Sequence, residues 1–292
     1  MNYEIVLADP AKNITVFVLN PVADQAAAAR ELLADPGLKA EQVGFVIPPA
    51  GEGGLWRLRM MGGEFCGNAA RSFGLFVARE QGLVGEQTVF IGMSGAAENL
   101  PVRVHVEEGR AVVEVPGPLA LDTLDFEGRS LPVYVFDGIT HVIAPDISPD
   151  TKVFSRIRDS IEGKFGRPAA GQPAATGQPP AAGQPVAAGL PLAALGVLFY
   201  DTAAAFMRPG VYVYATGSLV FESSCGSGSA ALALWKTGNL GDGETVCEVK
   251  QPGGLIEVRV RRRGGKVCGL SIGGKVTLSG RIELSGNRKP SV

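Results

Sequence analysis

Two cysteines occupy the same short sequence setting at two distant points of the chain. Cys66 lies in Gly63–Ser72, which reads GEFCGNAARS, and Cys225 lies in Glu222–Ala231, which reads ESSCGSGSAA. Each cysteine is followed by glycine, a small polar residue and then a run of residues that favours a helix. One such cysteine would be interpreted as a small buried residue at a tight turn. Two copies in the same setting predict paired thiol chemistry.

The helices expected after these motifs would place both cysteines at the positive ends of helix dipoles. Asn68 is expected to cap a helix that runs to about Glu80, and Ala230–Trp235 is expected to begin the second helix. Unpaired backbone N–H groups at a helix start attract anions. We therefore expect that a thiol at either position can be held as a reactive thiolate while neighbouring amides bind a carboxylate.

The composition is that of a globular protein with an ample core. The chain has 292 residues, of which 46% are hydrophobic and 19% are charged, enough for two domains. Its 27 basic and 29 acidic residues form no basic stripe, so nucleic acid is not an expected partner. The N-terminus lacks the pattern of a signal peptide, and no apolar run reaches about 18 residues. We expect a cytoplasmic protein that does not bind a membrane.

The remaining cysteines and the two histidines do not indicate a metal site. The four cysteines form no CxxC motif, and His105 and His141 have no second type of metal ligand at close spacing. Cys247 and Cys268 lie in alternating runs typical of strands, and we expect both to be free sheet cysteines. No metal ion is therefore expected.

Apolar periodicity predicts a strand-rich chain with two further helices, at Asp24–Leu33 and Asp150–Lys164. The expected strands alternate or are rich in β-branched residues. They are Tyr3–Leu7, Ile14–Leu19, Val43–Ile47, Leu55–Met60, Thr88–Met93, Val102–Val106, Ala111–Val115, Leu131–Phe136, His141–Ala144, Leu195–Tyr200, Ala203–Met207, Val211–Tyr214, Val246–Val249, Ile256–Arg261, Val267–Ile272 and Lys275–Leu284.

The order of strands, cysteine, helix and strands occurs twice, which indicates two similar domains. A pause in the pattern at Pro116–Pro118 predicts a boundary at about residue 120. The first domain is expected over 1–120 with a returning C-terminal strand at about 275–285, and the second over 121–274. Residues 167–189 repeat Gly-Gln-Pro three times among alanines, a composition that cannot build a core, so we expect a low-complexity surface insertion there.

The two motifs resemble those of the diaminopimelate epimerase superfamily. Cys66–Arg71 is similar to its Cys-Gly-Asn-small-x-Arg motif, and Cys225–Gly228 is similar to its Cys-Gly-Thr/Ser-Gly motif. Asn13, followed by a strand, and Gly138–His141, which resembles Gly-Asn-Pro-His, are weaker similarities. The resemblance implies an α+β fold of two similar domains, each a curved mixed β-sheet or barrel around a central helix. It also implies an active site in the cleft between the domains.

The resemblance further implies an amino-acid racemase or epimerase that works without a cofactor. Cys66 and Cys225 would act on opposite faces of the α-carbon, one thiolate removing the proton while the other thiol supplies one. An amino acid is the expected small-molecule partner, and a homodimer is expected. The expected substrate contacts are Asn13, Gly67, Asn68, His141, Glu222, Gly226 and Ser227.

Departures from the superfamily pattern argue against diaminopimelate as the substrate. Thr216–Ser218 stands where the diaminopimelate epimerases have Glu-Arg-Gly, Ile139 replaces an asparagine, and Arg59–Gly62 replaces Asn-x-Asp-Gly. The Glu222–Gly228 stretch looks like that of the histidine racemases of opine-type metallophore pathways. Histidine is therefore the first expected substrate.

Several alternatives stay open at this point, among them a binding module without catalysis, although binding alone requires no proton donor on both faces of a ligand. The chain could be a diaminopimelate epimerase proper, or an isomerase similar to phenazine-biosynthesis enzymes, although those use carboxylates instead of a thiol pair. Enzymes similar to proline racemase use two cysteines but usually carry histidine at the position of Asn68. A redox-regulated binding protein, with a disulfide between Cys66 and Cys225, is the non-enzyme alternative, although redox pairs usually occur as CxxC.

Overall fold

The computed structural model describes residues 2–51, 53–166, 193–214 and 216–285. Over these residues the chain is an α+β protein made mostly of strands, with eighteen strands and four helices. It divides into two compact units, of which unit 1 comprises Met1–Glu114 with Ile272–Val292 and unit 2 comprises Val115–Ser271. The insertion expected at 167–189 lies outside the described residues. None of the described helices combines the length and the apolar character that crossing a membrane requires.

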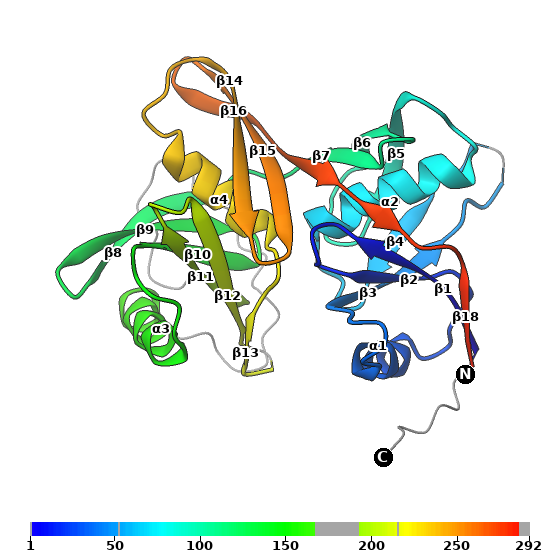
Figure 1. Ribbon diagram of the computed structural model, residues 1–292, viewed down its shortest axis with the longest axis horizontal. Coiled ribbons are helices and arrows are strands. Elements are labelled where there is room, and N and C mark those ends of the chain that lie inside the picture. Colours follow the sequence, from blue (N-terminus) through cyan, green and yellow to red (C-terminus); the bar gives the residue numbers. More distant parts are fainter. Residues whose placement is uncertain (1, 52, 167–192, 215, 286–292) are drawn as a thin grey trace. The chain divides into compact units, whose positions relative to one another are not determined.

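Unit 1 combines strands from both ends of the chain with two helices. The first strand, β1, pairs antiparallel with β2 on one edge and with β17 and β18 on the other. The N-terminal strand is therefore held between its hairpin partner and the C-terminal segment (Figure 1). The elements are β1 (Asn2–Asp9), β2 (Thr15–Val18), α1 (Gln25–Ala34), β3 (Gln42–Ile47), β4 (Arg57–Met60), α2 (Gly67–Glu80), β5 (Glu86–Met93), β6 (Leu100–His105), β7 (Arg110–Glu114), β17 (Thr277–Leu278) and β18 (Ile282–Ser285).

Unit 2 holds the remaining strands and the other two helices. Its last strand, β16, continues from unit 2 into the part of the chain that belongs to unit 1 and pairs with β7. The elements are β8 (Ala120–Phe126), β9 (Arg129–Phe136), β10 (Ile139–Pro145), α3 (Thr151–Phe165), β11 (Ala194–Asp201), β12 (Phe206–Val213), β13 (Ser218–Phe221), α4 (Gly226–Lys236), β14 (Gly243–Gln251), β15 (Gly254–Arg263) and β16 (Lys266–Lys275).

The strand pairings follow the same order in both units. In unit 1, β2 pairs parallel with β3 and β4 with β5, and the connections run through α1 and α2. In unit 2, β10 pairs parallel with β11 and β12 with β14, and the connections include α3 and α4. Antiparallel neighbours are joined by tight turns, whereas parallel neighbours need a crossover, which is why each parallel pair flanks a helix.

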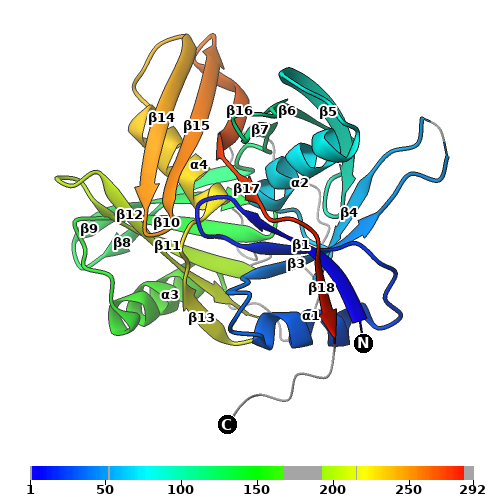
Figure 2. The same ribbon diagram turned by 45° about the vertical axis from the view of Figure 1, so that its right-hand side comes forward.

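Two of the four helices are enclosed by protein, and these are the helices that follow the cysteine motifs. Residues 68–78 of α2 and 228–234 of α4 are all buried, whereas α1 and α3 bury a single face. A helix that is buried all round packs in the interior. Helix α2 contacts β1, β5, β6 and β7, and α4 contacts β9, β10, β11, β14 and β15 (Figures 1 and 2).

Close packing holds α2 in the core of unit 1. The Phe17 ring from β2 makes edge-to-face contacts with Phe73 and Phe76 of α2, at centroid distances of 5.6 and 5.8 Å. On another side, a Cβ atom at Gly74 would lie 2.5 Å from a methyl carbon of Val102 in β6. Helix and sheet therefore approach closely at a position that only glycine permits.

Several expectations from the sequence differ from the structure. Asn68 is not the cap of its helix, because α2 begins at Gly67 and Cys66 itself is the capping residue. The expected strand at Ala203–Met207 begins only at Phe206, since residues 202–205 form a turn.

Strand boundaries also differ near the unit junction and at the C-terminal end. Strands β8 and β13 were not predicted, and β8 starts at Ala120, where the boundary was expected. The single C-terminal strand expected at Lys275–Leu284 is two short strands, β17 and β18. The assignment of the chain to domains 1–120 and 121–274 stays a prediction.

Candidate active site

Cys66 caps the enclosed helix of unit 1 with its own sulfur. The residue is in extended conformation, and its Sγ accepts the Ala69 N–H at a distance of 3.5 Å. The Cys66 carbonyl accepts the next free amide, that of Ala70, at 2.8 Å. A sulfur is an unusual cap where Ser, Thr, Asp or Asn would be preferred, and it places the thiol at the positive end of α2.

The segment before Cys66 is held by the turn that follows β5. Ser94 Oγ donates to the Glu64 carbonyl at 3.0 Å and accepts the Met60 N–H at 2.9 Å. Gly95 has a φ of +72°, and a Cβ atom there would lie 2.3 Å from the Phe65 nitrogen. Both the backbone angle and the contact require glycine at this turn.

A chain of polar side chains runs through the buried side of this site. Arg71, which is fully buried, donates from Nε to Asn68 Oδ1 at 3.2 Å, and Asn68 Nδ2 donates to Asn13 Oδ1 at 3.2 Å. Asn13 Nδ2 in turn donates to Glu41 Oε2 at 2.6 Å. Arg71 also donates to the carbonyls of Gly274 and Lys275. The predicted residues Asn13 and Asn68 therefore lie together, and each fixes the amide orientation of the other.

Gln42, which contacts Cys66, and Thr15 and Glu41, which bond to residues of this site, were not expected from the sequence. The Gln42 side chain hydrogen-bonds the Cys66 sulfur, and its Oε1 lies 3.5 Å from the Thr15 hydroxyl, which donates to it. Glu41 ends the polar chain described above. Thr15 and Gln42 are opposite each other in the parallel β2–β3 pair. The sequence offered one signal for this group, a threonine at the start of an apolar strand. Only the β2–β3 pairing connects this threonine, through Gln42, to Cys66.

Cys66 is partly buried, and desolvation of its sulfur is the largest effect on its protonation. Desolvation raises the pKa of the Cys66 thiol, and the Glu64 carboxylate raises this pKa further. Hydrogen bonds from the Ala69 N–H, the Gln42 amide and the Asn68 N–H lower the pKa of the thiol but do not reverse the shift.

Cys225 caps the enclosed helix of unit 2 in the same manner. It is in extended conformation, and its Sγ accepts the Gly228 N–H at 3.4 Å. A Cβ atom at position 228 would lie 3.2 Å from this sulfur and 2.7 Å from a Leu198 methyl carbon. The second glycine of the motif therefore gives the sulfur its space.

A buried glutamine fixes the backbone of Cys225. Gln251 Oε1 accepts the Cys225 N–H at 2.8 Å, and Gln251 Nε2 donates to Ser229 Oγ at 2.9 Å. Ser229 Oγ donates to the Cys225 carbonyl at 2.7 Å. Neither Gln251 nor Ser229 was expected as part of the site, because Gln251 reaches it from the end of β14 and only the fold brings the two together.

His141 and Ser227, both predicted from the sequence, lie beside Cys225. His141 Nε2 is 2.8 Å from Ser227 Oγ, and Ser227 Oγ is 3.6 Å from Cys225 Sγ. The histidine side chain is fully buried, and its ring makes an edge-to-face contact with Phe136. Burial lowers the pKa of His141 to about 3, so the imidazole is neutral.

Cys225 faces groups with opposite effects on its proton. Burial raises the pKa of the Cys225 thiol well above its ordinary value, and the Glu222 carboxylate adds to this through its charge and a hydrogen bond. Ser227 and the Gly228 N–H lower this pKa by hydrogen-bonding the sulfur. Glu222, predicted as a polar site residue, therefore does lie next to the second cysteine.

Burial opposes the thiolate form that the helix starts were expected to favour, because it raises the pKa of both cysteines. The amides at each helix start do hydrogen-bond the sulfurs, but desolvation is the larger effect at both residues. Cys66 and Cys225 therefore rest as thiols at neutral pH. Cys66, Gly67, Asn13 and Asn68 lie in unit 1, whereas Cys225, Gly226, Ser227, His141 and Glu222 lie in unit 2.

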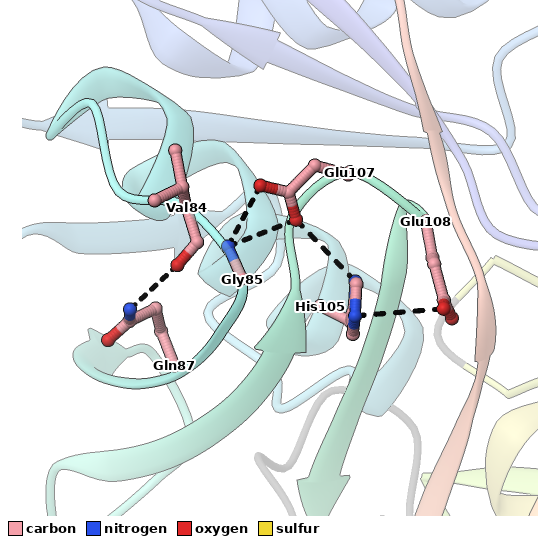
Figure 3. Close-up of polar contacts among 6 residues, drawn as sticks. All are labelled: Val84, Gly85, Gln87, His105, Glu107 and Glu108. Carbon is pink, nitrogen blue, oxygen red and sulfur yellow. Dashed lines mark hydrogen bonds and ion pairs between the residues drawn. The ribbon is translucent and has the colours of Figure 1, made fainter.

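The other histidine belongs to a turn and to neither cysteine site. His105 lies between Glu107 and Glu108, with Nδ1 and Nε2 each 3.6 Å from one carboxylate oxygen (Figure 3). Both Glu107 oxygens accept the Gly85 N–H, and these hydrogen bonds lower the pKa of the Glu107 carboxyl. The cluster stabilises the β6–β7 turn against the segment before β5.

Comparison with known proteins gives a consistent result. Residues 3–165 and 184–282 match the family described as the histidine racemase CntK N-terminal domain. The chain is 29% identical over 264 residues to a histidine racemase from Fusobacterium nucleatum subsp. nucleatum, and the alignment covers 87% of each chain. The stretch that the family match leaves out, 166–183, falls largely within the expected insertion.

Solved structures resemble the chain in fold at low sequence identity. A predicted epimerase from Pseudomonas aeruginosa superposes with a TM-score of 0.60 at 15% identity, covering 97% of this chain and 99% of the other. A phenazine biosynthesis protein of the PhzF family from Enterococcus faecalis superposes with a TM-score of 0.59 at 14% identity, covering 98% of this chain and all of the other. At this level of identity the similarity shows the fold alone.

Proposed function

The chain belongs to the histidine racemase CntK N-terminal domain family and is an isomerase of the amino-acid racemase class, and from this premise we propose that it interconverts L- and D-histidine by two-thiol proton transfer. In the proposed reaction Cys66 and Cys225 act on opposite faces of the substrate α-carbon. One sulfur removes the α-proton and the other delivers a proton to the opposite face, and their roles exchange in the reverse direction.

The observation that carries this proposal is the matching environment of the two sulfurs. Each cysteine caps an enclosed helix, and each Sγ accepts a backbone N–H three residues further along the chain. A helix start also stabilises the negative charge that develops on a substrate carboxylate and carbanion. The predicted carboxylate ligands are the backbone N–H groups of Gly67, Asn68, Gly226 and Ser227.

Both sulfurs start as thiols, so the proposed reaction needs one of them to lose its proton first. The raised pKa values predict that kcat/KM increases with pH through the neutral range and above the ordinary thiol pKa of about 8.5. The increase reflects the growing fraction of protein with one thiolate and one thiol. At still higher pH the second thiol would lose its proton as well, and kcat/KM would stop increasing.

The proposed substrate follows from the relatives and from the sequence. The relative from Fusobacterium nucleatum is named for histidine. The chain also lacks the Glu-Arg-Gly and Asn-x-Asp-Gly segments that the diaminopimelate epimerases carry, with Thr216–Ser218 and Arg59–Gly62 at those positions. A side chain without a distal amino-carboxylate group fits these departures.

The proposed architecture is two similar domains, each with a central helix that presents its cysteine to a shared active site. The matching order of parallel and antiparallel pairs in the two units supports it. The enclosed positions of α2 and α4 support it as well.

The direct test follows the substrate α-proton. The reduced protein, free of pyridoxal phosphate, is incubated in heavy water with a panel of L-amino acids that includes histidine and diaminopimelate. Loss of the α-proton signal and formation of the D-enantiomer with histidine alone are expected. Turnover of diaminopimelate in preference to histidine would overturn the substrate, and silence across the panel would overturn the racemase assignment of this chain.

Removal of either thiol tests the mechanism. Cys66→Ala and Cys225→Ala are each expected to lower the racemisation kcat by at least about 10³-fold, because each removes a group that transfers a proton in the transition state. Cys268→Ala, which changes an exposed cysteine in β16, is the matched control and is expected to leave kcat unchanged. Full turnover in either of the first two variants would exclude the two-thiol mechanism.

A further inference from the structure

Hydrogen bonds connect His141 to Ser227 and Ser227 to Cys225 within unit 2. The His141 Nε2 to Ser227 Oγ distance is 2.8 Å, and the Ser227 Oγ to Cys225 Sγ distance is 3.6 Å, within the range of a hydrogen bond to sulfur. The direction of each bond depends on which ring nitrogen of His141 carries the proton.

The surroundings of the His141 ring indicate which of its two nitrogens carries the proton. His141 Nδ1 is buried and has no hydrogen-bond partner among the described residues. It lies against the backbone of Gly196 in the neighbouring strand β11, where a Cβ atom would be 2.1 Å from Nδ1. A buried N–H without an acceptor is rarer in proteins than a buried acceptor without a donor. The proton of the neutral ring therefore resides on Nε2.

This tautomer fixes the hydroxyl of Ser227. Nε2–H donates to Ser227 Oγ and occupies one of its lone pairs, so the hydroxyl proton of Ser227 is directed away from the ring. The Cys225 sulfur, 3.6 Å from Ser227 Oγ, is within reach of this proton. Because His141 is neutral, it acts by orienting this hydroxyl and not through a charge.

We propose that Ser227 is the hydrogen-bond donor that stabilises the Cys225 thiolate during turnover, and that His141 is a positioning residue that holds the Ser227 hydroxyl in this direction. The proposal rests on the proposed function, in which Cys225 alternates between thiol and thiolate. It adds a side-chain role for both residues that is separate from binding of the substrate.

Glu222 acts on Cys225 in the opposite sense to Ser227. Its carboxylate accepts a hydrogen bond from the Cys225 thiol, which favours the protonated form, whereas Ser227 favours the thiolate. The titratable or charged groups that face Cys225 among the described residues are Glu222 directly and His141 through Ser227. The thiol and the thiolate of Cys225 therefore each have a hydrogen-bond partner. A residue that acts as a base in one direction and as an acid in the other needs both.

Among the residues that the structure describes, no histidine and serine pair like His141 and Ser227 hydrogen-bonds to Cys66. The residue that corresponds to Ser227 in the first motif is Asn68, whose side chain donates to Asn13. The side-chain donor to the Cys66 sulfur is Gln42, from β3. Substitutions at His141 and Ser227 are therefore expected to change Cys225 and to leave Cys66 as an internal control in the same chain.

The test measures the pKa of each cysteine separately. The full-length protein is alkylated with iodoacetamide over a range of pH, and the extent of modification of the Cys66 and Cys225 peptides is followed by mass spectrometry. Ser227→Ala is expected to raise the Cys225 midpoint by about one pH unit, since a hydrogen bond to a charged group is lost. The Cys66 midpoint is expected to stay unchanged.

Further variants separate positioning from general disruption. His141→Phe is expected to raise the Cys225 midpoint by less than Ser227→Ala, because the hydroxyl remains but is no longer oriented. Ser227→Thr and His141→Gln keep a hydroxyl and an N–H donor and are expected to restore the original midpoint. Ser229→Ala, which removes a buried hydroxyl bonded to the Cys225 carbonyl and not to its sulfur, is the matched control and is expected to cause no shift.

Each outcome decides the proposal. An unchanged Cys225 midpoint in Ser227→Ala, or equal shifts at Cys66 and Cys225, would overturn it. A shift in Ser227→Ala without any in His141→Phe would remove the role of His141. Ultraviolet absorbance of the thiolates during a pH titration, taken as the difference from the Cys225→Ala variant, gives the Cys225 midpoint without reagent access to the buried sulfur. Neither readout requires racemisation, so failure of the proposed function would appear separately, as absence of α-proton exchange in the unmodified protein.

Discussion

At the scale of single residues, burial and local hydrogen bonds compete for the proton of each cysteine. The N-terminal position on a helix, which the motif predicts, provides the N–H groups of Ala69 and Gly228 to the two sulfurs. Desolvation nevertheless raises the pKa of both thiols. A helix start contributes a partial charge, whereas transfer of a full negative charge out of water is opposed by several times that effect.

The buried His141 predicts how the stability of the protein depends on pH. Its pKa is about 3 in the folded protein and about 6.5 in the unfolded chain, so the unfolded chain binds the extra proton first. The stability associated with the neutral ring is fully present above about pH 6.5 and is lost as the pH falls toward 3.

Urea unfolding of the protein and of His141→Gln between pH 7 and 4 measures this dependence. The free energy of unfolding of the unsubstituted protein is expected to fall relative to that of the variant by about 1.4 kcal/mol per pH unit below about pH 6.5. Parallel curves for the two proteins would mean that the ring becomes charged without unfolding, and hence that it is accessible to water.

At the scale of elements, turns and helix starts hold the two sulfurs in place. The turn after β5 packs its glycine, Gly95, against the Phe65 backbone directly before Cys66. Helix α2 is tied to the C-terminal segment by Arg71. Helix caps and apolar periodicity are local signals, which is why Asp24 and Asp150 were found from the sequence as the starts of α1 and α3.

Gly95→Ala tests the contribution of the turn to the position of Cys66. The new methyl group would meet the Phe65 nitrogen at 2.3 Å and is expected to displace the motif, lowering kcat by about 10-fold or more and also the melting temperature. Gly128→Ala is the matched control, because Gly128 has nearly the same φ, +73°, with nothing within 4 Å of the added Cβ. It is expected to cost about 1 kcal/mol of stability with no change in kcat. Equal kcat values in the two variants would contradict the proposed link between this turn and Cys66.

At the scale of the whole molecule, the C-terminal segment returns to the first strand. Strands β17 and β18 pair with β1, so residues from the two ends of the chain complete one sheet. The sequence predicted that the last strand would return to the first domain. No short stretch of sequence indicated that its pairing partner is β1. Homodimer formation stays a prediction.

The stretch at 167–189 can be tested by deletion. The family match leaves out residues 166–183, and the composition of the stretch cannot build a core. Removal of residues 167–189 is expected to change kcat less than twofold and the melting temperature by no more than a few degrees. A loss of activity or of solubility would show that the stretch contributes to the folded protein, and replacement by a glycine-serine linker of equal length distinguishes an effect of length from one of sequence.

The sequence by itself identified the candidate residues for the proposed chemistry and most of the segments that become helices. Cys66 and Cys225 with their following residues, and the capped or periodic segments of all four helices, are encoded within short windows of the chain. The tertiary structure alone decided the partners of these residues. Gln42 at Cys66, and Gln251 and His141 at the Cys225 motif, come from strands distant in sequence. The degree of burial, which sets the protonation of both thiols, likewise depends on the packing of the whole chain, because desolvation is a property of the complete fold and not of a motif.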